Sequence, residues 1–165
     1  MPRPGCSNGQ LKWADVKKVI EPILVDPEFL VINNENTQVP RILICGDRNY
    51  INKSLITAFL ESVPKNSIII EGECRGADKI AGEVAGDLGM EVLKFPCDWS
   101  LGKKSGPIRN KKMLVEGQPT HVIAFHDDID NSKGTKNMLA QAQKAGIPTY
   151  LNAESWKELE KWKTI

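Results

Sequence analysis

Short apolar runs alternate with segments of helical period from residue 41 onward. The apolar runs predict strands over residues 41–45, 67–71, 91–95, 120–125 and 147–151. Alternation of strands with helices is typical of βαβ units around a parallel sheet. We therefore expect an α/β domain with a parallel sheet of about five strands and helices on both faces.

The segments between the predicted strands carry apolar residues on one helical face. These faces consist of Leu55, Phe59 and Val63, of Ile80, Val84 and Leu88, and of Met138, Leu139 and Ala142. Pro107 suits the first turn of a helix that runs to about Glu116, and Asn152 is expected to cap a last helix with Trp156 and Leu159. The helices are expected to stop at Gly89, Gly117 and Gly146.

Right-handed crossovers arrange five such strands most simply in the order 3-2-1-4-5, which is a doubly wound sheet. A ligand crevice then lies at the carboxyl ends of the strands, where the first and fourth strands diverge. The loops that meet there begin after residues 45, 71, 95 and 125. Because the unusual residue clusters of the chain fall in these loops, we expect one binding site at this edge.

Three glycine-containing turns stand at predicted strand-to-helix junctions. The first lies in residues 67–78, SIIIEGECRGAD, and places Gly72, Arg75 and Gly76 ahead of a helix. The others are Gly46-Asp47-Arg48 and Ser132-Lys133-Gly134-Thr135. Backbone N–H groups and the positive end of a helix dipole favour a bound anion, and glycine lets the backbone approach it closely. Such turns also occur where an α/β domain merely closes a loop.

Residues 1–39 differ from the rest and are expected to form an extension to a domain that spans residues 40–165. Residues 1–10 predict a flexible arm, and residues 29–32 an added edge strand that a polar linker over 33–38 follows. An amphipathic helix is predicted from Trp13, Val16, Val19, Ile20 and Leu24. The extension either covers a sheet edge or makes an oligomer contact, and we expect a homo-oligomer.

The formal net charge is +1, from 22 basic and 21 acidic residues, so broad electrostatics give no reason to bind nucleic acid or an anionic membrane. An anionic ligand must therefore be held by a local site. The four cysteines are widely spaced, without a CxxC pair or clustered histidines, which disfavours a zinc site or a disulfide framework. The sequence carries no signal-peptide pattern and no long apolar stretch, and we expect a cytoplasmic protein with no membrane partner.

Residues 126–130, HDDID, form an oxygen-rich loop of the kind that binds Mg²⁺ or Ca²⁺. The sequence around this loop does not match the EF-hand pattern. Counting from Asp128, the sixth and twelfth positions are Lys133 and Leu139 rather than glycine and glutamate. We expect no metal and no cofactor, except a Mg²⁺ ion that arrives with a nucleotide phosphate. His126 is placed for ligand contact or acid–base work, whereas His121 belongs to the fourth strand.

The loop motifs resemble those of a known family. Residues 46–50, GDRNY, are similar to its GSRxW motif, and residues 72–78, GECRGAD, to its GGAxGAD. Residues 96–113 resemble PADW…GPxRNxxM, and residues 132–148 resemble SxGTxxxxxxAxxxGIPV. Over residues 41 to about 150, the chain thus resembles the YspA-like branch of the SLOG superfamily. The resemblance implies a Rossmann-like fold that binds nucleotides or nucleotide-derived ligands, and it implies no settled reaction.

Most residues that we expect to bind the ligand also have a structural interpretation. Arg48 and Arg109 either hold phosphate or form surface salt bridges. Asp78 is a better candidate for a helix cap that orients the glycine turn than for catalysis. Trp99 either stacks on a base or is buried against the sheet. The full set of predicted ligand-binding residues is Gly46, Asp47, Arg48, Gly72, Arg75, Gly76, Ala77, Asp78, Asp98, Trp99, Arg109, Asn110, His126, Ser132, Lys133, Gly134 and Thr135.

The superfamily includes the "lonely guy" phosphoribohydrolases, which cleave the N-glycosidic bond of nucleoside monophosphates. Arg109 matches the arginine of their RKxxM segment, but their glutamate after PGGxGT is absent, since residues 136–139 read KNML here. Cleavage builds positive charge on the sugar, which a carboxylate beside the anomeric carbon stabilises. The acidic residues at the same edge that could replace this glutamate are Glu71, Glu73, Asp47 and Asp78.

Three functions follow from these observations. The favoured one is a module that senses, carries or sequesters a nucleotide or an ADP-ribose-like ligand, in keeping with the missing glutamate. The first alternative is a hydrolase of nucleoside 5′-monophosphates, with Arg109 on the phosphate and Glu71 or Glu73 in the chemistry. The second alternative is a DNA-associated protein, because the DNA-processing protein DprA shares the superfamily; the near-neutral charge argues against it.

Overall fold

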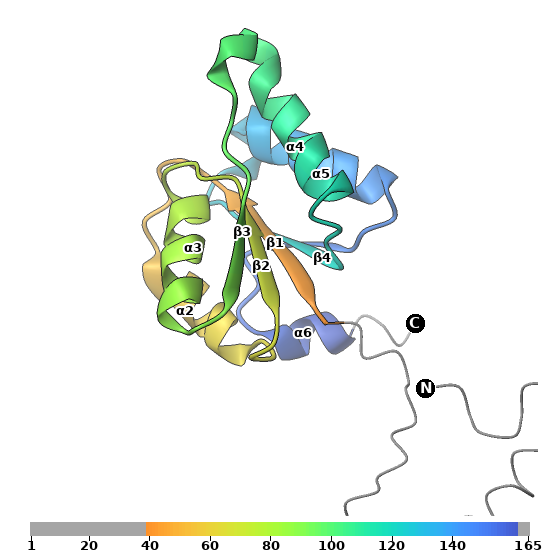
Figure 1. The fold of residues 1–165 in the computed structure, drawn as a ribbon. Coiled ribbons are helices and arrows are strands. Elements are labelled where there is room, and N and C mark those ends of the chain that lie inside the picture. Colours follow the sequence, from red (N-terminus) through yellow and green to blue (C-terminus); the bar gives the residue numbers. More distant parts are fainter. Residues whose placement is uncertain (1–38, 162–165) are drawn as a thin grey trace, which may run out of the picture. The chain divides into compact units, whose positions relative to one another are not determined.

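The chain divides into two units, Met1–Gln38 and Val39–Ile165. The computed structural model describes residues 39–161, so the predictions for the arm, helix, edge strand and linker of the extension lie outside the described residues. The described part is an α/β domain built on a single five-stranded sheet (Figure 1).

The sheet is parallel and has the strand order β3-β2-β1-β4-β5, which confirms the predicted Rossmann-like topology. The strands are β1 (Arg41–Gly46), β2 (Ile68–Glu71), β3 (Glu91–Lys94), β4 (His121–Phe125) and β5 (Thr149–Leu151). In the register of β1 with β4, Ile42 pairs with His121 and Gly46 with Phe125. The two strands therefore end level with each other, and the loops that follow them start side by side.

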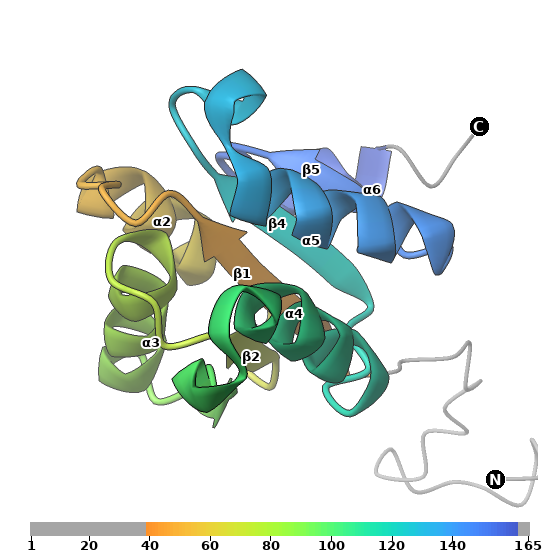
Figure 2. The same ribbon diagram turned by 90° about the horizontal axis from the view of Figure 1, so that it is seen from above.

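Helices cover both faces of the sheet (Figure 2). On one face lie α2 (Lys53–Ser62), α3 (Ala77–Asp87) and α6 (Trp156–Lys161), and on the other lie α4 (Ser105–Val115) and α5 (Lys133–Lys144). No helix within residues 39–161 is long and apolar enough to cross a membrane.

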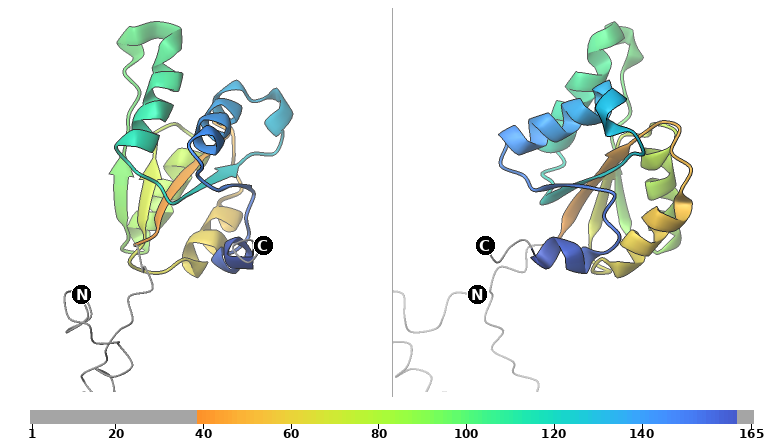
Figure 3. Two further views of the ribbon diagram at one scale, coloured as in Figure 1. Left: turned by 90° about the vertical axis from the view of Figure 1, so that its right-hand side faces the viewer. Right: turned by 180° about the vertical axis from the view of Figure 1, so that it is seen from behind.

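Two short 3₁₀ helices, η1 (Trp99–Lys104) and η2 (Ile129–Asn131), stand in the loops that precede α4 and α5. The segment formed by η1 and the start of α4 projects beyond the carboxyl ends of the strands (Figure 3). We call this segment the η1 projection. It places residues of the β3–α4 loop above the edge at which the binding site was predicted.

The side chains of β1 alternate between two hydrophobic cores, one on each face of the sheet. Ile42 and Ile44 belong to the core that α2, α3 and α6 complete. Leu43 and Cys45 belong to the smaller core, to which α4 contributes Met113. Because both of its faces are buried, the residues of β1 from Ile42 to Cys45 are all apolar, and this is the pattern that identified the strand in the sequence.

The first four strands differ from their predicted ranges by one residue each, and two predictions at the C-terminal end of the domain need a larger correction. β5 begins at Thr149 rather than at residue 147, because the N–H of Ile147 donates to the carbonyl of Ala142 and Pro148 has no N–H to offer to a sheet. Asn152 does not cap the last helix, which begins only at Trp156. It instead adopts a φ of 50°, a left-handed conformation that asparagine tolerates better than most residues.

Candidate functional site

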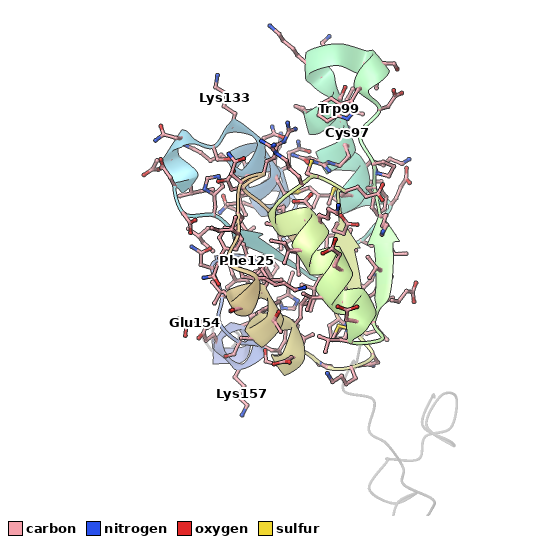
Figure 4. The ribbon with its side chains drawn as sticks, turned by 90° about the vertical axis from the view of Figure 1, so that its left-hand side faces the viewer. Cys97, Trp99, Phe125, Lys133, Glu154 and Lys157 are labelled. Atoms are coloured by element: carbon pink, nitrogen blue, oxygen red, sulfur yellow. The ribbon has the colours of Figure 1, made fainter. Side chains whose placement is uncertain are left out.

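Four loops surround a cavity of about 680 Å³ at the carboxyl edge of the sheet. This volume lies within the range of roughly 300–1,000 Å³ that is usual for small-molecule sites. Figure 4 shows Trp99 and Lys133 at this end of the molecule, and Glu154 and Lys157 at the opposite end. The predicted residues that line the cavity are Gly46, Asp47, Arg48, Arg75, Asp78, Arg109, Asn110, His126, Ser132, Lys133, Gly134 and Thr135.

The floor of this site is held together by backbone hydrogen bonds of Asp47. Its N–H donates to the carbonyl of Phe125 at the end of β4 (3.0 Å), and its carbonyl accepts from the N–H of Ala77 at the start of α3 (3.1 Å). These contacts require glycine at two neighbours, because a Cβ at Gly46 would lie 2.0 Å from the Phe125 oxygen and one at Gly76 would lie 2.2 Å from the Asp47 oxygen. Gly76 also has a φ of 81°. Three loops are thereby fixed to one another through the main chain.

The turn over residues 72–78 differs from the anion cradle that the sequence predicted, because three of its backbone donors, those of Gly72, Glu73 and Ala77, already have partners within the protein. The N–H of Gly72 donates to Asp78 Oδ2 (3.2 Å), and the N–H of Glu73 donates to Glu71 Oε2 (2.5 Å). The Ala77 N–H is taken by Asp47, as described above. Asp78 thus holds the glycine turn from the first turn of α3, whose N-cap is Gly76 and has no side-chain cap bond, and these amides are not available to a ligand.

Asp78 is itself buried and paired with Arg109 of α4. Arg109 Nη1 lies 3.7 Å from Asp78 Oδ2, and the side chains of the two residues are only 12% and 4% exposed. The same nitrogen donates to the carbonyl of Gly72 (2.5 Å), and Nη2 contacts the sulfur of Cys74 (3.6 Å). Burial raises the pKa of Asp78 to about 6, against the lowering effect of the Arg109 guanidinium and of backbone N–H donors. Arg109 therefore joins α4 to the β2–α3 turn, in addition to lining the cavity.

Glu71 lies outside the cavity, although the sequence placed it among the candidate catalytic residues. Its side chain is buried beneath α3, where its carboxyl group lies next to Gly82. Burial raises the pKa of Glu71 from 4.5 to about 7, partly offset by the hydrogen bond from the Glu73 N–H and reinforced by the nearby Asp78 charge. In this position the carboxyl group serves the glycine turn rather than the cavity.

The raised pKa of Glu71 predicts a pH dependence of stability. Since the folded protein binds this proton more tightly than the unfolded chain, its contribution to the unfolding free energy is complete below pH 4.5 and is lost as the pH rises through about 7. Replacing Glu71 by Gln removes the titration, so the fall in unfolding free energy between pH 5 and pH 8 should shrink by about 1–3 kcal/mol. Urea denaturation at both pH values measures this fall. The exposed Glu83→Gln change in the neighbouring helix α3 is the control, and equal falls in both variants would contradict the assignment.

The amino-terminal end of α5 differs from the 72–78 turn because it keeps unpaired backbone donors. Ser132 is the N-cap, and its Oγ accepts from the N–H of Thr135 (3.1 Å). The N–H groups of Lys133 and Gly134 have no acceptor among residues 39–161. A Cβ at Gly134 would meet no atom within 4 Å, so the space beside it is open. This helix end has the donors, the dipole and the room that an anion requires.

His126 lies at the end of β4 and is fixed on several sides. Asn152 Oδ1 accepts from the His126 N–H and Asn152 Nδ2 donates to its carbonyl, both at 2.9 Å. The N–H of Asp128 donates to His126 Nδ1 (3.0 Å), which leaves Nε2 as the protonated nitrogen of the neutral ring. His126 thus lines the cavity with a ring that its neighbours hold in place.

The cavity has a local excess of positive charge in a chain that is almost neutral overall. Its basic side chains are Arg48, Arg75, Lys103, Arg109 and Lys133, and its acidic side chains are Asp47, Asp78 and Asp128. The Arg109 and Asp78 charges offset each other in their buried pair. The basic residues that remain outnumber the acidic ones and line the same cavity as the amino-terminal end of α5, so the electrostatics of the site favour an anion.

The other predicted site residues lie outside the main cavity. Gly72, Glu73 and Trp99 line a second cavity of about 390 Å³, which shares the wall residues Arg48, Cys74 and Arg75 with the first. The interpretation of Trp99 as a residue buried against the sheet is wrong, because its side chain is 61% exposed. Glu71, Gly76, Ala77 and Asp98 line neither cavity.

Sequence reasoning missed Asn137 and Asn152. Asn137 Oδ1 accepts from Asn110 Nδ2 (3.1 Å) and from Gln141 Nε2 (2.7 Å), so it joins α4 to α5 at the rim of the cavity. The spacing of Asn137 and Gln141, four residues apart on one helical face, is a signal that could have identified this pair. Asn152 carries no comparable signal, because its partner His126 is 26 residues away in the chain.

The comparisons with known proteins agree with this architecture. The model of the YspA, cpYpsA-related SLOG family matches residues 40–102. The Gene 61 protein of Mycobacterium phage D29 is 32% identical over an alignment of 118 residues, and the match covers 66% of this chain and 92% of that protein. The crystal structure of DNA processing protein A (DprA) from Streptococcus pneumoniae superposes with a TM-score of 0.57 at 14% identity, over 68% of this chain. This chain spans half of that DprA chain, and the likeness shows a shared fold. The sequence matches, together with the fold, show that the chain belongs to the YspA, cpYpsA-related SLOG family.

Proposed function

We propose that this protein binds a nucleotide or a nucleotide-derived ligand, with a phosphate group at the amino-terminal end of α5. The observation that carries the proposal is the pair of unpaired N–H groups of Lys133 and Gly134, which stand beside open space in a cavity with excess positive charge. A phosphate placed there accepts both N–H groups and interacts with the helix dipole. The side chains of Ser132 and Thr135 and the basic residues around them complete its surroundings.

Binding without turnover agrees best with the positions of the acidic residues. Glu71 is buried away from the cavity, Asp78 is paired with Arg109, and Glu73 lines the second cavity. Asp47 and Asp128 line the main cavity, but each accepts a local hydrogen bond, from the Asn49 N–H and from Asn131 Nδ2 respectively. A hydrolase would need one of these carboxylates beside the anomeric carbon. We therefore place nucleotide N-glycosidase activity second, and a DprA-like association with DNA third.

The Gly134→Ala variant tests the proposal because it separates binding from folding. The added methyl group enters the open space beside the α5 amides, where we place the phosphate. Affinity for AMP and ADP-ribose should fall at least about tenfold, while the melting temperature without ligand should stay the same or rise, since alanine is favoured over glycine in helices. Calorimetric titration and thermal unfolding give these two quantities. At a ligand concentration of 100 times the dissociation constant, the wild-type protein gains roughly 2.7 kcal/mol of unfolding free energy.

Gly86→Ala is the matched control. Gly86 lies within α3, a Cβ there also meets no atom within 4 Å, and the residue lines neither cavity. This variant should gain stability from the same helix propensity and keep the affinity of the wild type. Equal affinities of the wild type and Gly134→Ala would contradict the phosphate position. Release of free base, detected by chromatography of the same mixtures, would favour the hydrolase instead.

A further inference from the structure

Trp99 is a large apolar side chain held in an exposed position on the η1 projection. The guanidinium group of Arg48 lies over this ring, with Cζ 5.4 Å from the ring centroid, which is a cation–π distance. The turn that carries Trp99 is fixed by Asp98, whose Oδ1 accepts from the N–H and the hydroxyl of Ser100 (3.0 and 2.6 Å). The hydroxyl of Ser105 also donates to the Asp98 carbonyl (2.7 Å). The ring is thus oriented by its own loop and by Arg48, although it is 61% exposed.

The ring borders the second cavity, which shares three lining residues with the main one. Trp99, Pro96 and Cys97 line it from the β3–α4 loop, and Glu73 lines it from the β2–α3 turn. Its volume of about 390 Å³ lies within the range of roughly 300–1,000 Å³ for ligand sites. The shared residues include Arg48, which faces both cavities. A ligand with two chemically different ends therefore has a place for each of them.

We propose that the second cavity binds the nucleobase of the ligand, with the base stacked on Trp99 and its phosphate in the main cavity. This assignment rests on the proposed function. It adds a position for the base, whereas the main cavity accounts only for the phosphate. Aromatic rings stack on bases of any type, because every base has a π face. Arg48, between the two cavities, lies beside the ring and at the edge of the anionic site, where it contacts both ends of such a ligand.

Glu73 supplies the polar partner for the edge of the base. Its carboxylate is 41% exposed and lies 3.7 Å from Lys94, so it keeps acceptor capacity toward the cavity. Its backbone is held at a φ of 53°, a conformation uncommon for residues other than glycine, by the hydrogen bond from its N–H to Glu71. A carboxylate accepts hydrogen bonds from amino and ring N–H groups. The geometry therefore favours a base that bears an amino group, such as adenine or guanine.

The test compares two probes, AMP and ribose 5-phosphate, which share the sugar phosphate and differ at C1, where AMP carries adenine and ribose 5-phosphate a hydroxyl. In Trp99→Ala, affinity for AMP should fall about 5- to 150-fold, the equivalent of about 1–3 kcal/mol for one stacked base. Affinity for ribose 5-phosphate should not change. Trp99→Phe should retain AMP binding but lose the ligand-induced change in tryptophan fluorescence, because the stacked fluorophore is gone. Calorimetry and fluorescence titration of the full chain measure both.

Leu101→Ala is the matched control, since Leu101 is an apolar residue of the same 3₁₀ helix, is 49% exposed and lines neither cavity. It should bind both probes like the wild type. Trp99→Ala with unchanged AMP affinity would overturn the base site and leave the phosphate site standing. A wild-type protein that binds neither probe, nor ADP-ribose, would overturn the proposed function and the base site together.

Discussion

The Arg109→Ala variant is expected to lose about 3–5 kcal/mol of unfolding free energy at pH 8, as is usual when a buried ion pair loses one partner. The change leaves the carboxylate of Asp78 buried without a counter-charge and removes a donor from the Gly72 carbonyl. The loss should be smaller at pH 5, below the pKa of about 6 of Asp78, because the protonated carboxyl needs no counter-charge. Urea denaturation at both pH values measures the difference.

A second salt bridge in the same helix provides the control. Lys112 lies 3.8 Å from Glu116, but both side chains are more than half exposed. Lys112→Ala should therefore cost less than about 0.5 kcal/mol and show little dependence on pH over this range. Combining Arg109→Ala with Asp78→Asn should recover part of the loss at pH 8, since no buried charge is left. An Arg109→Ala loss below about 1 kcal/mol, or one equal at the two pH values, would show that the pair does not organise the turn.

The Gly46→Ala variant is expected to lose about 3 kcal/mol or more of unfolding free energy, beyond the usual cost of overpacking. The added Cβ would lie 2.0 Å from the Phe125 oxygen and 2.6 Å from the Ala77 Cβ, so β1 must separate from β4 or from α3. Either movement breaks a hydrogen bond of Asp47. Thermal unfolding measures the loss, and amide hydrogen exchange should show faster exchange at Asp47 and Ala77.

Gly106→Ala is the comparison for this variant. Gly106 also lines the cavity, but a Cβ there meets no atom within 4 Å. Its stability should stay within about 1 kcal/mol of the wild type. If Gly46→Ala were as stable as Gly106→Ala, the three loops would not depend on the close backbone approach at Gly46.

The sheet could be predicted from the sequence because its signals are local. The apolar runs of β1 and β4 are buried on both faces, and right-handed crossovers leave few arrangements of five parallel strands. The edge of the site follows from the same rule, since loops after the central strands share one end of the sheet. The extent of β5 depended on the end of α5, where Ile147 donates back into the helix, and the apolar pattern does not record such a bond.

The sequence does not predict which glycine turn keeps free N–H groups for a ligand, because this depends on which donors a buried carboxylate reaches. The sequence placed glycine turns at both α3 and α5, and nothing in the residue types distinguishes them. The structure separates them, because Asp78 and Glu71 use the amides of one turn, while Lys133 and Gly134 keep theirs. The position of Trp99 depended in the same way on Arg48, 51 residues earlier in the chain.

The hydrogen bonds of Asp47 that join the three loops involve its peptide groups and not its side chain. No particular side chain is required at this position for the frame to form, provided that Gly46 and Gly76 stay. Substitutions at residues 47–49 can therefore alter what the site recognises while its framework is inherited intact. A scaffold of this kind lets ligand preference diversify among related proteins at little cost to folding.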